Sequence, residues 1–331
     1  LGGDLIYTQV GANTFNITLK LYRDCNGIPL YAFEDIEWHS SCGSGVVTAF
    51  RNGYTDITPT CPGLPTACQS GSGTIGIEEH VYTTTVNIPS GCTDIVFDYT
   101  LCCRNYSITT LANPGSENIY LSASYTAPIN TLNNSPVFNN YPTPIVCVNQ
   151  PVIYNHGVYD PDGDSLYFSA SDCYEGYNDP VEYLPGFSGL SPLTTSNPIQ
   201  IDPNTGAISF TPSAQQVGVM CILVEEFRNG VKIGSTLRDI QFNVTVCANV
   251  PPTASGINNT AGIDSLDFVT SICANSQICF DLSFSDAESQ MLSIDWNQEI
   301  ANSTFQIFNN NTLAPTATFC WTPQSSDIGL R

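Results

Sequence analysis

The chain has few charged side chains, and very few of them are positive. Only 11% of its 331 residues are charged, with 8 Lys and Arg against 30 Asp and Glu. Nucleic-acid binding depends on clustered Lys and Arg, and so does attraction to an anionic membrane surface. The formal net charge of −22 therefore argues against both, and favours a soluble, self-repelling surface or one that binds divalent cations.

Long apolar runs and the common catalytic motifs are also missing. No stretch of 18 apolar residues occurs, so we expect no membrane insertion. There is no HExxH, P-loop or GxSxG motif, and the three histidines, His39, His80 and His156, lie far apart in the sequence. Glycoside cleavage by a pair of carboxylates is not ruled out, since any two Asp or Glu can meet in space, but the sequence favours no pair. We therefore expect a protein that is not an enzyme.

Cysteine, by contrast, is abundant. Fourteen cysteines accompany only three histidines, and no CxxC pair occurs, which is a poor inventory for zinc and a good one for disulfides. Disulfides persist in oxidising compartments outside the cytoplasm. The chain starts at Leu1 rather than Met, which we interpret as removal of a signal peptide. We expect an extracellular protein.

Strand patterns dominate the rest. Runs of β-branched and aromatic residues, interrupted by Gly, Pro, Asn and Asp, occur at 15–22, 95–103, 118–126, 221–227 and 240–247. No amphipathic helix longer than two turns is predicted. The pattern indicates an all-β protein of tandem Ig-like or cadherin-like β-sandwich domains.

Two proline-containing linkers, 133–136 and 249–252, suggest the domain boundaries. We predict a disulfide-rich β-sandwich over 1–130, a cadherin-like sandwich with an aromatic insertion over 131–248, and a second cadherin-like repeat over 249–331.

The segments after the linkers repeat. Cys147-Val148-Asn149-Gln150 matches Cys273-Ala274-Asn275-Ser276, and the acidic stretch from Asp160 matches that from Asp286, both at an offset of 126 residues. Phe210-Thr211-Pro212 matches Trp321-Thr322-Pro323 at an offset of 111. The first copy continues through two more strands to Cys247, whereas the second stops at Arg331. We expect the last repeat to be incomplete, with the chain continuing or a partner supplying strands.

The repeat also suggests disulfides. We predict the pairs Cys147–Cys247, Cys173–Cys221 and Cys279–Cys320, the last joining two sheets, with the partner of Cys273 beyond Arg331. The first domain holds seven cysteines, whose connectivity stays open. Cys102 and Cys103 should point to opposite faces of a strand and so find different partners.

The strongest motif is Asp160-Pro161-Asp162-Gly163-Asp164. Alternate carboxylates around a Gly turn suit a hard cation such as Ca²⁺, and the alternative is an Asx-rich turn without an ion. It is not an EF-hand, because Ser171 stands where the final Glu is needed. A weaker copy has only Asp286 and Glu288, and the linker residues Asn134 and Asn249 are candidate further ligands.

A second candidate site is the insertion in the middle domain. It carries four aromatic residues, Tyr174, Tyr177, Tyr183 and Phe187, which on a long loop are typical of a ligand-binding surface. The alternative is that they cover the sheet edge of their own domain.

Three segments carry a family resemblance. The opening Gly2-Gly3-Asp4, the stretch 19–27 (LKLYRDCNG) and Cys102-Cys103-Arg104-Asn105 resemble the first domain of large type IX-secreted surface proteins of Bacteroidota. The modules with the acidic loop resemble bacterial cadherin-like or PKD-like repeats.

The resemblance implies a large exported protein at the cell surface. Asp160, Asp162 and Asp164 match the family's calcium loop, and Asp286 and Glu288 match it only in part. It implies a structural or adhesive subunit of a surface fibre or appendage used for attachment, gliding or gripping other cells. We expect a homo-oligomer or filament, with a cell-surface glycan or protein as a further partner. The alternative is a carbohydrate- or protein-binding module of a secreted protein.

Overall fold

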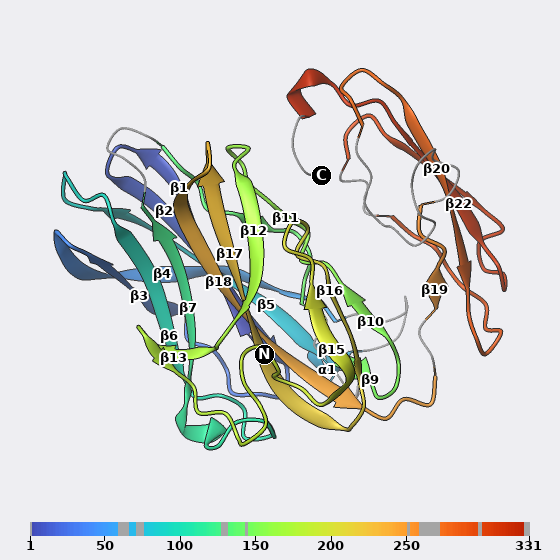
Figure 1. Ribbon diagram of the computed structural model, residues 1–331, viewed down its shortest axis with the longest axis horizontal. Coiled ribbons are helices and arrows are strands. Elements are labelled where there is room, and N and C mark those ends of the chain that lie inside the picture. The colour runs from blue at the N-terminus through green and yellow to red at the C-terminus, as the bar shows by residue number, and fades with distance from the viewer. Residues whose placement is uncertain are drawn as a thin grey trace. The chain divides into compact units, whose positions relative to one another are not determined.

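The computed structural model describes residues 2–58, 66–70, 76–126, 132–142, 145–249, 252–257, 272–296 and 300–327. In these residues almost all regular structure is strand, which confirms the predicted all-β class (Figure 1). The helical pieces described are α1 (Ala67–Ser70) and two 3-10 turns, Pro114–Ser116 and Ser325–Asp327. The chain forms two compact units, Leu1–Val246 and Cys247–Arg331, and each is described by itself.

The first half of unit 1 is an antiparallel sheet that closes on itself. Its strands, in order around the ring, are β1 (Gly2–Gly11), β2 (Thr14–Asp24), β5 (Ile77–Asn87), β4 (Gly43–Asp56), β3 (Phe33–Ser40), β6 (Ile95–Cys102), β7 (Asn118–Tyr125) and β18 (Val231–Thr245). β18 closes the ring because it pairs with β7 through residues 234–237 and with β1 through residues 239–240. Alternate side chains point inward and form one core around Tyr7, Phe15 and Phe97.

The second half of unit 1 is a two-layer sandwich. One layer continues from β18 into β17 (Gln216–Arg228) and β12 (Ser165–Ser171), and β9 (Ile145–Cys147) runs parallel to the far end of β18. The other layer is β10 (Val152–Tyr154), β16 (Ile208–Pro212) and β15 (Thr195–Ile201). Two short pairs complete it: β8 (Val137–Phe138) with β11 (Val158–Tyr159), and β13 (Tyr174–Gly176) with β14 (Asp179–Pro180). Phe168, Phe210 and Phe242 pack between the layers.

The predicted boundary at residue 130 therefore does not separate compact units. β18, which belongs to the predicted second domain, is the strand that closes the sheet of the first. The predicted boundary at 248 lies two residues from the division between Val246 and Cys247.

The Gly-Gly-Asp opening has a physical reason at this closure. A Cβ on Gly2 would lie 2.1 Å from the carbonyl oxygen of Asp239, and a Cβ on Gly3 would lie 2.6 Å from that of Lys20. Only glycine lets β1 approach this closely. The next residue, Asp4, is 1% exposed and pairs with the fully buried Arg238 at 2.7 Å, while Tyr22 donates to its other oxygen.

Unit 2 repeats one layer of this sandwich. Its sheet is β19 (Thr253–Ala254), β20 (Ile278–Ser285), β22 (Thr316–Trp321) and β21 (Thr304–Phe308). Ile278 pairs with Trp321 as Val152 pairs with Phe210, at the offsets of 126 and 111 found in the sequence. The repeat is thus conserved in strand register as well as in sequence.

The structure contains the predicted bridges Cys173–Cys221 and Cys279–Cys320. Cys279 lies directly opposite Cys320 on neighbouring strands. This bridge therefore joins two strands of one sheet, whereas the sequence predicted that it would join two sheets. Cys147 and Cys247 are each disulfide-bonded, and their pairing with each other stays a prediction.

The first domain's bridges are Cys25–Cys68, Cys42–Cys92 and the adjacent pair Cys102–Cys103. The prediction of separate partners for the last two was wrong, because β6 ends at Cys102 and the alternation of faces ends with it. Cys61 lies outside the described residues, and Cys273 is an exposed free thiol.

Candidate cation site

The acidic loop is a tight turn between β11 and β12. The Oδ1 atom of Asp160 accepts the backbone N–H groups of Asp162 and Asp164 at 2.8 and 3.0 Å, and Gly163 has φ of 80°. These bonds fold the loop back on its first residue, as in an Asx turn. They bring one carboxylate oxygen of each aspartate within 4.8 Å of the others, so the three predicted ligands do lie together.

Asn134 braces this loop to the closed sheet. Its backbone N–H and Nδ2 donate to the two oxygens of Asp162 at 2.7 and 2.9 Å. Its Oδ1 accepts the N–H of Gln9 in β1 at 3.0 Å. The side-chain oxygen that a cation would need is therefore engaged with the backbone, and Asn134 acts as a brace between the sheet and the loop.

Arg228, which the sequence motif did not reveal, already supplies one positive charge. It is the last residue of β17, and its guanidinium donates to both oxygens of Asp164. It also donates to Oδ1 of Asn133 at 2.9 Å and lies 3.7 Å from Asp162. The hydrogen bonds that Arg228 donates to Asp164 raise the pKa of Arg228 further, so the guanidinium keeps its positive charge.

Glu226 is a second group that the motif did not reveal. It lies two residues before Arg228 and is fully buried, with Oε2 accepting Nδ2 of Asn133 at 3.2 Å. Among the residues that the structure describes, its Oε1 has no hydrogen-bond partner, and the same is true of the buried Oδ2 of Asp160. Burial, and then the negative charge of Asp160, raise the pKa of Glu226 to about 9. Burial also raises the pKa of Asp160.

These groups fit a hard cation in part. Ca²⁺ takes six to eight oxygens, and the cluster offers the unpaired carboxylate oxygen of Asp160 together with oxygens of Asp162 and Asp164. Four acidic side chains stand against one arginine, so the site can accept further positive charge. The protonated state of Glu226 is the alternative way of relieving the same repulsion.

The second copy has the same turn with fewer charges. Oδ1 of Asp286 accepts the N–H groups of Glu288 and Gln290 at 2.9 and 3.0 Å, and Ser289 takes the positive φ of Gly163. Gln290 replaces the third carboxylate and donates to Asn249 at 2.7 Å. Asn249 thus accepts a hydrogen bond from the loop, whereas Asn133 in the first copy accepts one from Arg228.

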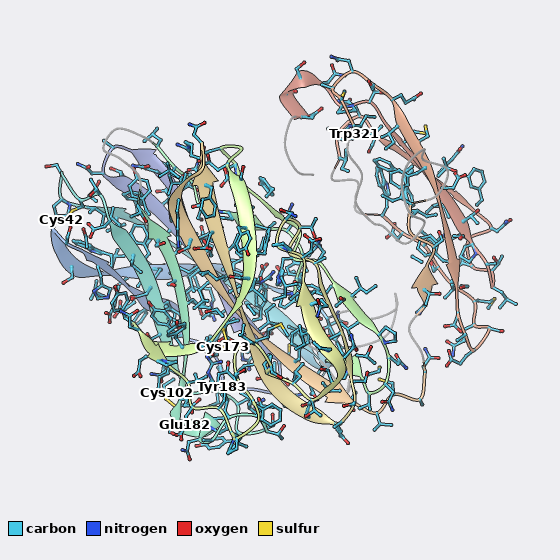
Figure 2. All side chains as sticks on the ribbon, viewed as in Figure 1. Cys42, Cys102, Cys173, Glu182, Tyr183 and Trp321 are labelled. Carbon is cyan, nitrogen blue, oxygen red and sulfur yellow. A yellow bond between two sulfur atoms is a disulfide. The ribbon has the colours of Figure 1, made fainter. Side chains whose placement is uncertain are left out.

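The aromatic insertion packs over the first half of unit 1. Tyr183 bridges to Leu111, its hydroxyl accepts the N–H of Cys173, and burial raises its pKa to about 12. The ring of Tyr174 lies 6.2 Å from Tyr120. Figure 2 labels Tyr183 and Glu182 at the end of the unit where Cys102 lies.

Most of the predicted ligand loop is therefore packing surface. Phe187 is half-buried, and of the four predicted aromatics only Tyr177 is largely exposed, at 57%. The insertion covers β7 of the closed sheet, beyond the edge of its own sandwich.

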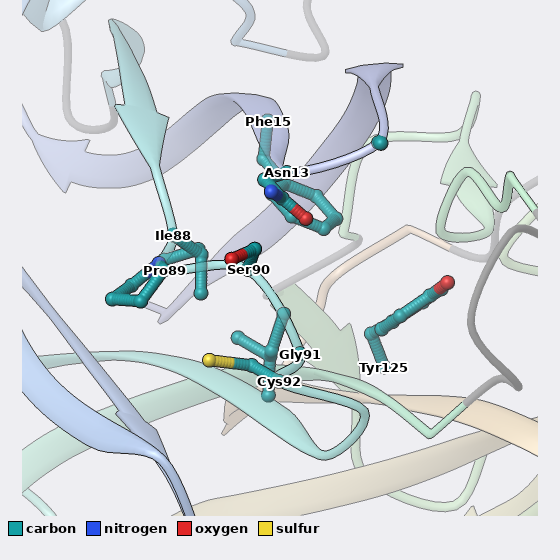
Figure 3. Close-up of a pocket in the computed structure, with 10 residues that line it drawn as sticks. Asn13, Phe15, Ile88, Pro89, Ser90, Gly91, Cys92 and Tyr125 are labelled. Atoms are coloured by element: carbon teal, nitrogen blue, oxygen red, sulfur yellow. The ribbon is translucent and has the colours of Figure 1, made fainter.

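A hollow of about 200 Å³ opens at one end of the closed sheet (Figure 3). Its lining comes from the β1–β2 turn, the segment 88–92 and Tyr125, and contains no carboxylate or histidine. It is smaller than most ligand pockets, which exceed about 300 Å³, and brings no acid–base pair together. Among the described residues, no helix has the length and apolar character needed to span a membrane.

Comparison with known proteins gives little. No family model and no curated protein matches the chain. Two solved structures show a weak likeness. The surface layer protein SbsC, domains 1-6, has 10% identity and a TM-score of 0.15, covering 94% of this chain and 49% of that one. The S-layer protein rSbsC(31-844) has 9% identity and a TM-score of 0.14, covering 95% and 49%. The chain spans about half the length of both, and TM-scores this low carry no argument about fold or function.

Proposed function

We propose that the chain is an extracellular structural and adhesive unit of a cell-surface fibre or appendage. The observation that carries the proposal is a repeat. In both half-sandwiches, the one that begins at Cys147 and the one that begins at Cys273, the acidic turn bonds to the asparagine of the preceding linker. Asp162 does so with Asn134, and Gln290 with Asn249. Repeated modules with locked linkers suit a protein that transmits force along its length.

The covalent framework supports this role. Bridges such as Cys25–Cys68, Cys42–Cys92 and Cys173–Cys221 tie strands far apart in the sequence of unit 1. Disulfides limit how far a stretched chain extends and lower the entropy of the unfolded state. They are also typical of extracellular proteins. We infer a place at the cell surface, in a homo-oligomer or filament.

Calcium has a defined place in the proposal. Asp160, Asp162 and Asp164 would hold the ion, with Glu226 behind them, and the bound charge would replace the proton on Glu226. Because Asn134 bonds to both Asp162 and β1, fixing the loop also fixes the entry to the sandwich.

Single-molecule pulling tests the mechanical role. We expect unit 1 to unfold at a higher force in calcium than in a chelator. Extension should stay short until a reductant opens the bridges of unit 1. Cys173–Cys221, with a separation of 48 residues, should account for about 160 Å of the released chain. A matched pair of variants, Asp162→Asn and Asp179→Asn, separates the loop from general charge effects.

Two outcomes would contradict the proposed mechanical role. If Asp162→Asn and Asp179→Asn behave alike and calcium leaves the force unchanged, the calcium part of the proposal fails. If unit 1 unfolds at forces no higher than those of ordinary non-mechanical domains, the structural role fails with it.

A second candidate is recognition of a glycan or a protein. Phe33 and Phe50 lie opposite each other on β3 and β4, and are 53% and 62% exposed. Nearby on β4, Tyr54 is 63% exposed and stacks on His80. Flat, exposed rings of this kind suit stacking against a sugar or an apolar side chain. Loss of cell attachment by Phe50→Ser, with unchanged pulling behaviour, would favour this function.

A further inference from the structure

Three metal-ligating side chains meet on the outer face of the closed sheet, away from the acidic loop. Glu37 and His39 are two residues apart on β3, so they point to the same side. Asp98 lies directly opposite Glu37 on the neighbouring strand β6. The alternating buried residues Ile36 and Trp38 point into the core, which fixes the outward direction of the other two.

The spacing of these groups suits a transition-metal ion better than a hydrogen bond. Nε2 of His39 lies 3.4 Å from a carboxylate oxygen of Glu37 and 3.4 Å from one of Asp98. Both distances exceed the usual range of about 2.7–3.2 Å for N–H···O bonds. Two ligands bound to Zn²⁺ at about 2.0–2.1 Å in tetrahedral geometry stand about 3.3–3.4 Å apart. All three ligand atoms lie within 4.8 Å of one another.

The most buried of the three ligands is held in place from behind. Asp98 is 3% exposed, and the hydroxyl of Tyr120 donates to its Oδ2 at 3.1 Å. Ligating carboxylates are commonly oriented by such outer hydrogen bonds. On the other side the ring of Tyr177 packs on the imidazole of His39, with centroids 5.6 Å apart. The one largely exposed aromatic of the insertion thus helps to orient the imidazole.

We propose that Glu37, His39 and Asp98 bind one Zn²⁺ ion. The donor set is one imidazole and two carboxylates, whose two negative charges balance the ion. Water completes the fourth position, which stays open toward solvent because Glu37 is 59% exposed. The ion links β3 to β6 at the point where the tip of the insertion rests on the sheet. This site differs from the acidic loop in having a nitrogen ligand, which favours zinc over calcium.

The chain's three histidines make the test direct. Histidine-selective NMR of the oxidised Cys273→Ser chain gives three imidazole signals, assigned with single His→Asn variants. We expect Zn²⁺ to shift the His39 signal alone and to saturate at one equivalent, with excess Ca²⁺ leaving it in place. Glu37→Gln changes an exposed side chain and should leave the fold intact while weakening binding by about tenfold or more.

The matched control is His80, which also lies beside a carboxylate. Its Nε2 is 2.9 Å from Glu78, but Arg23 occupies the same oxygen at 2.7 Å. We therefore expect His80→Asn to bind Zn²⁺ as the parent does. The proposal is overturned if Zn²⁺ shifts His80 instead, if no signal moves at millimolar Zn²⁺, or if Glu37→Gln binds as tightly as the parent. The last result would mean that Glu37 is not a ligand of the ion.

Discussion

The two copies of the half-sandwich share their backbone and differ in their charges. In both, the first aspartate of the loop accepts two backbone N–H groups, two and four residues on. In the first copy β17 adds Glu226 and Arg228, and β18 adds the buried Arg238. The described residues of the second copy form a four-stranded sheet. The turn is therefore encoded locally, whereas its electrostatics come from strands far along the chain.

Weakening the point at which β18 closes the first sheet should have the largest effect on stability. Arg238→Ala leaves Asp4 buried without its partner, which costs about 3–5 kcal/mol. Hydrogen exchange read by mass spectrometry should show lower protection across unit 1 and no change in unit 2. The double variant Arg238→Met with Asp4→Leu removes both charges and should regain part of the loss. Equal losses in the single and double variants would mean that the pair is not the source of the stability.

Opening the bridge of the second copy is the converse test. Replacing Cys279 and Cys320 by serine removes a link across 41 residues, which should cost about 2–4 kcal/mol in unit 2. Protection in unit 1 should not change. The measurement is the same exchange experiment, and a loss shared by both units would contradict the division into two units.

Calcium should stabilise the first loop and not the second, with a smaller effect on stability than the two changes above. At a free concentration about 100 times its dissociation constant, a bound ion adds about 2.7 kcal/mol. We expect Asp160→Asn to abolish the calcium-dependent rise in melting temperature, and Asp286→Asn to leave it unchanged. If the two variants behave alike, the extra carboxylates of the first loop do not create a site.

The all-β class, the repeat and two of the disulfides could be predicted because each rests on a local or periodic pattern. Alternation along strands gave the class, and offsets of 126 and 111 residues gave a register that the structure repeats. The closing of the first sheet by β18 could not be predicted in the same way. Strand partners as far apart in the sequence as Gly2 and Ile240 leave no periodic trace, and the two glycines at the start gave only a resemblance.

The candidate site shows the same limit. Asp160, Asp162 and Asp164 are close because the turn is short, so sequence spacing was enough. Glu226 and Arg228 alternate on β17 and face the loop only after the sheet has formed. A pair of adjacent glutamates, Glu225 and Glu226, in the otherwise apolar stretch Cys221–Phe227 was the available signal. Its meaning depended on the register of β12 against β17, which the sequence does not specify.

Glu226 provides the finest distinction between the copies, through pH. Its pKa is about 9 in the folded chain against an ordinary value of 4.5 for a glutamate side chain, so the folded state holds a proton that the unfolded state has released. This stabilisation is complete below pH 4.5 and is lost as the pH rises through 9, at up to about 1.4 kcal/mol for each pH unit between. Urea unfolding of unit 1 at pH 5.5, 6.5 and 7.5 should show this slope, and Glu226→Gln should flatten it.

Glu225→Gln is the matched control, because Glu225 is the neighbouring residue but pairs with Lys232 outside the core. It should keep the slope of the parent. Saturating Ca²⁺ should also flatten the slope, since an ion beside Asp160 favours the ionised form of Glu226. Parallel slopes for the parent and Glu226→Gln would show that the carboxyl is ionised in the folded chain. The repulsion in the first loop would then be relieved by Arg228 alone, and the two copies would differ in charge without differing in their response to protons.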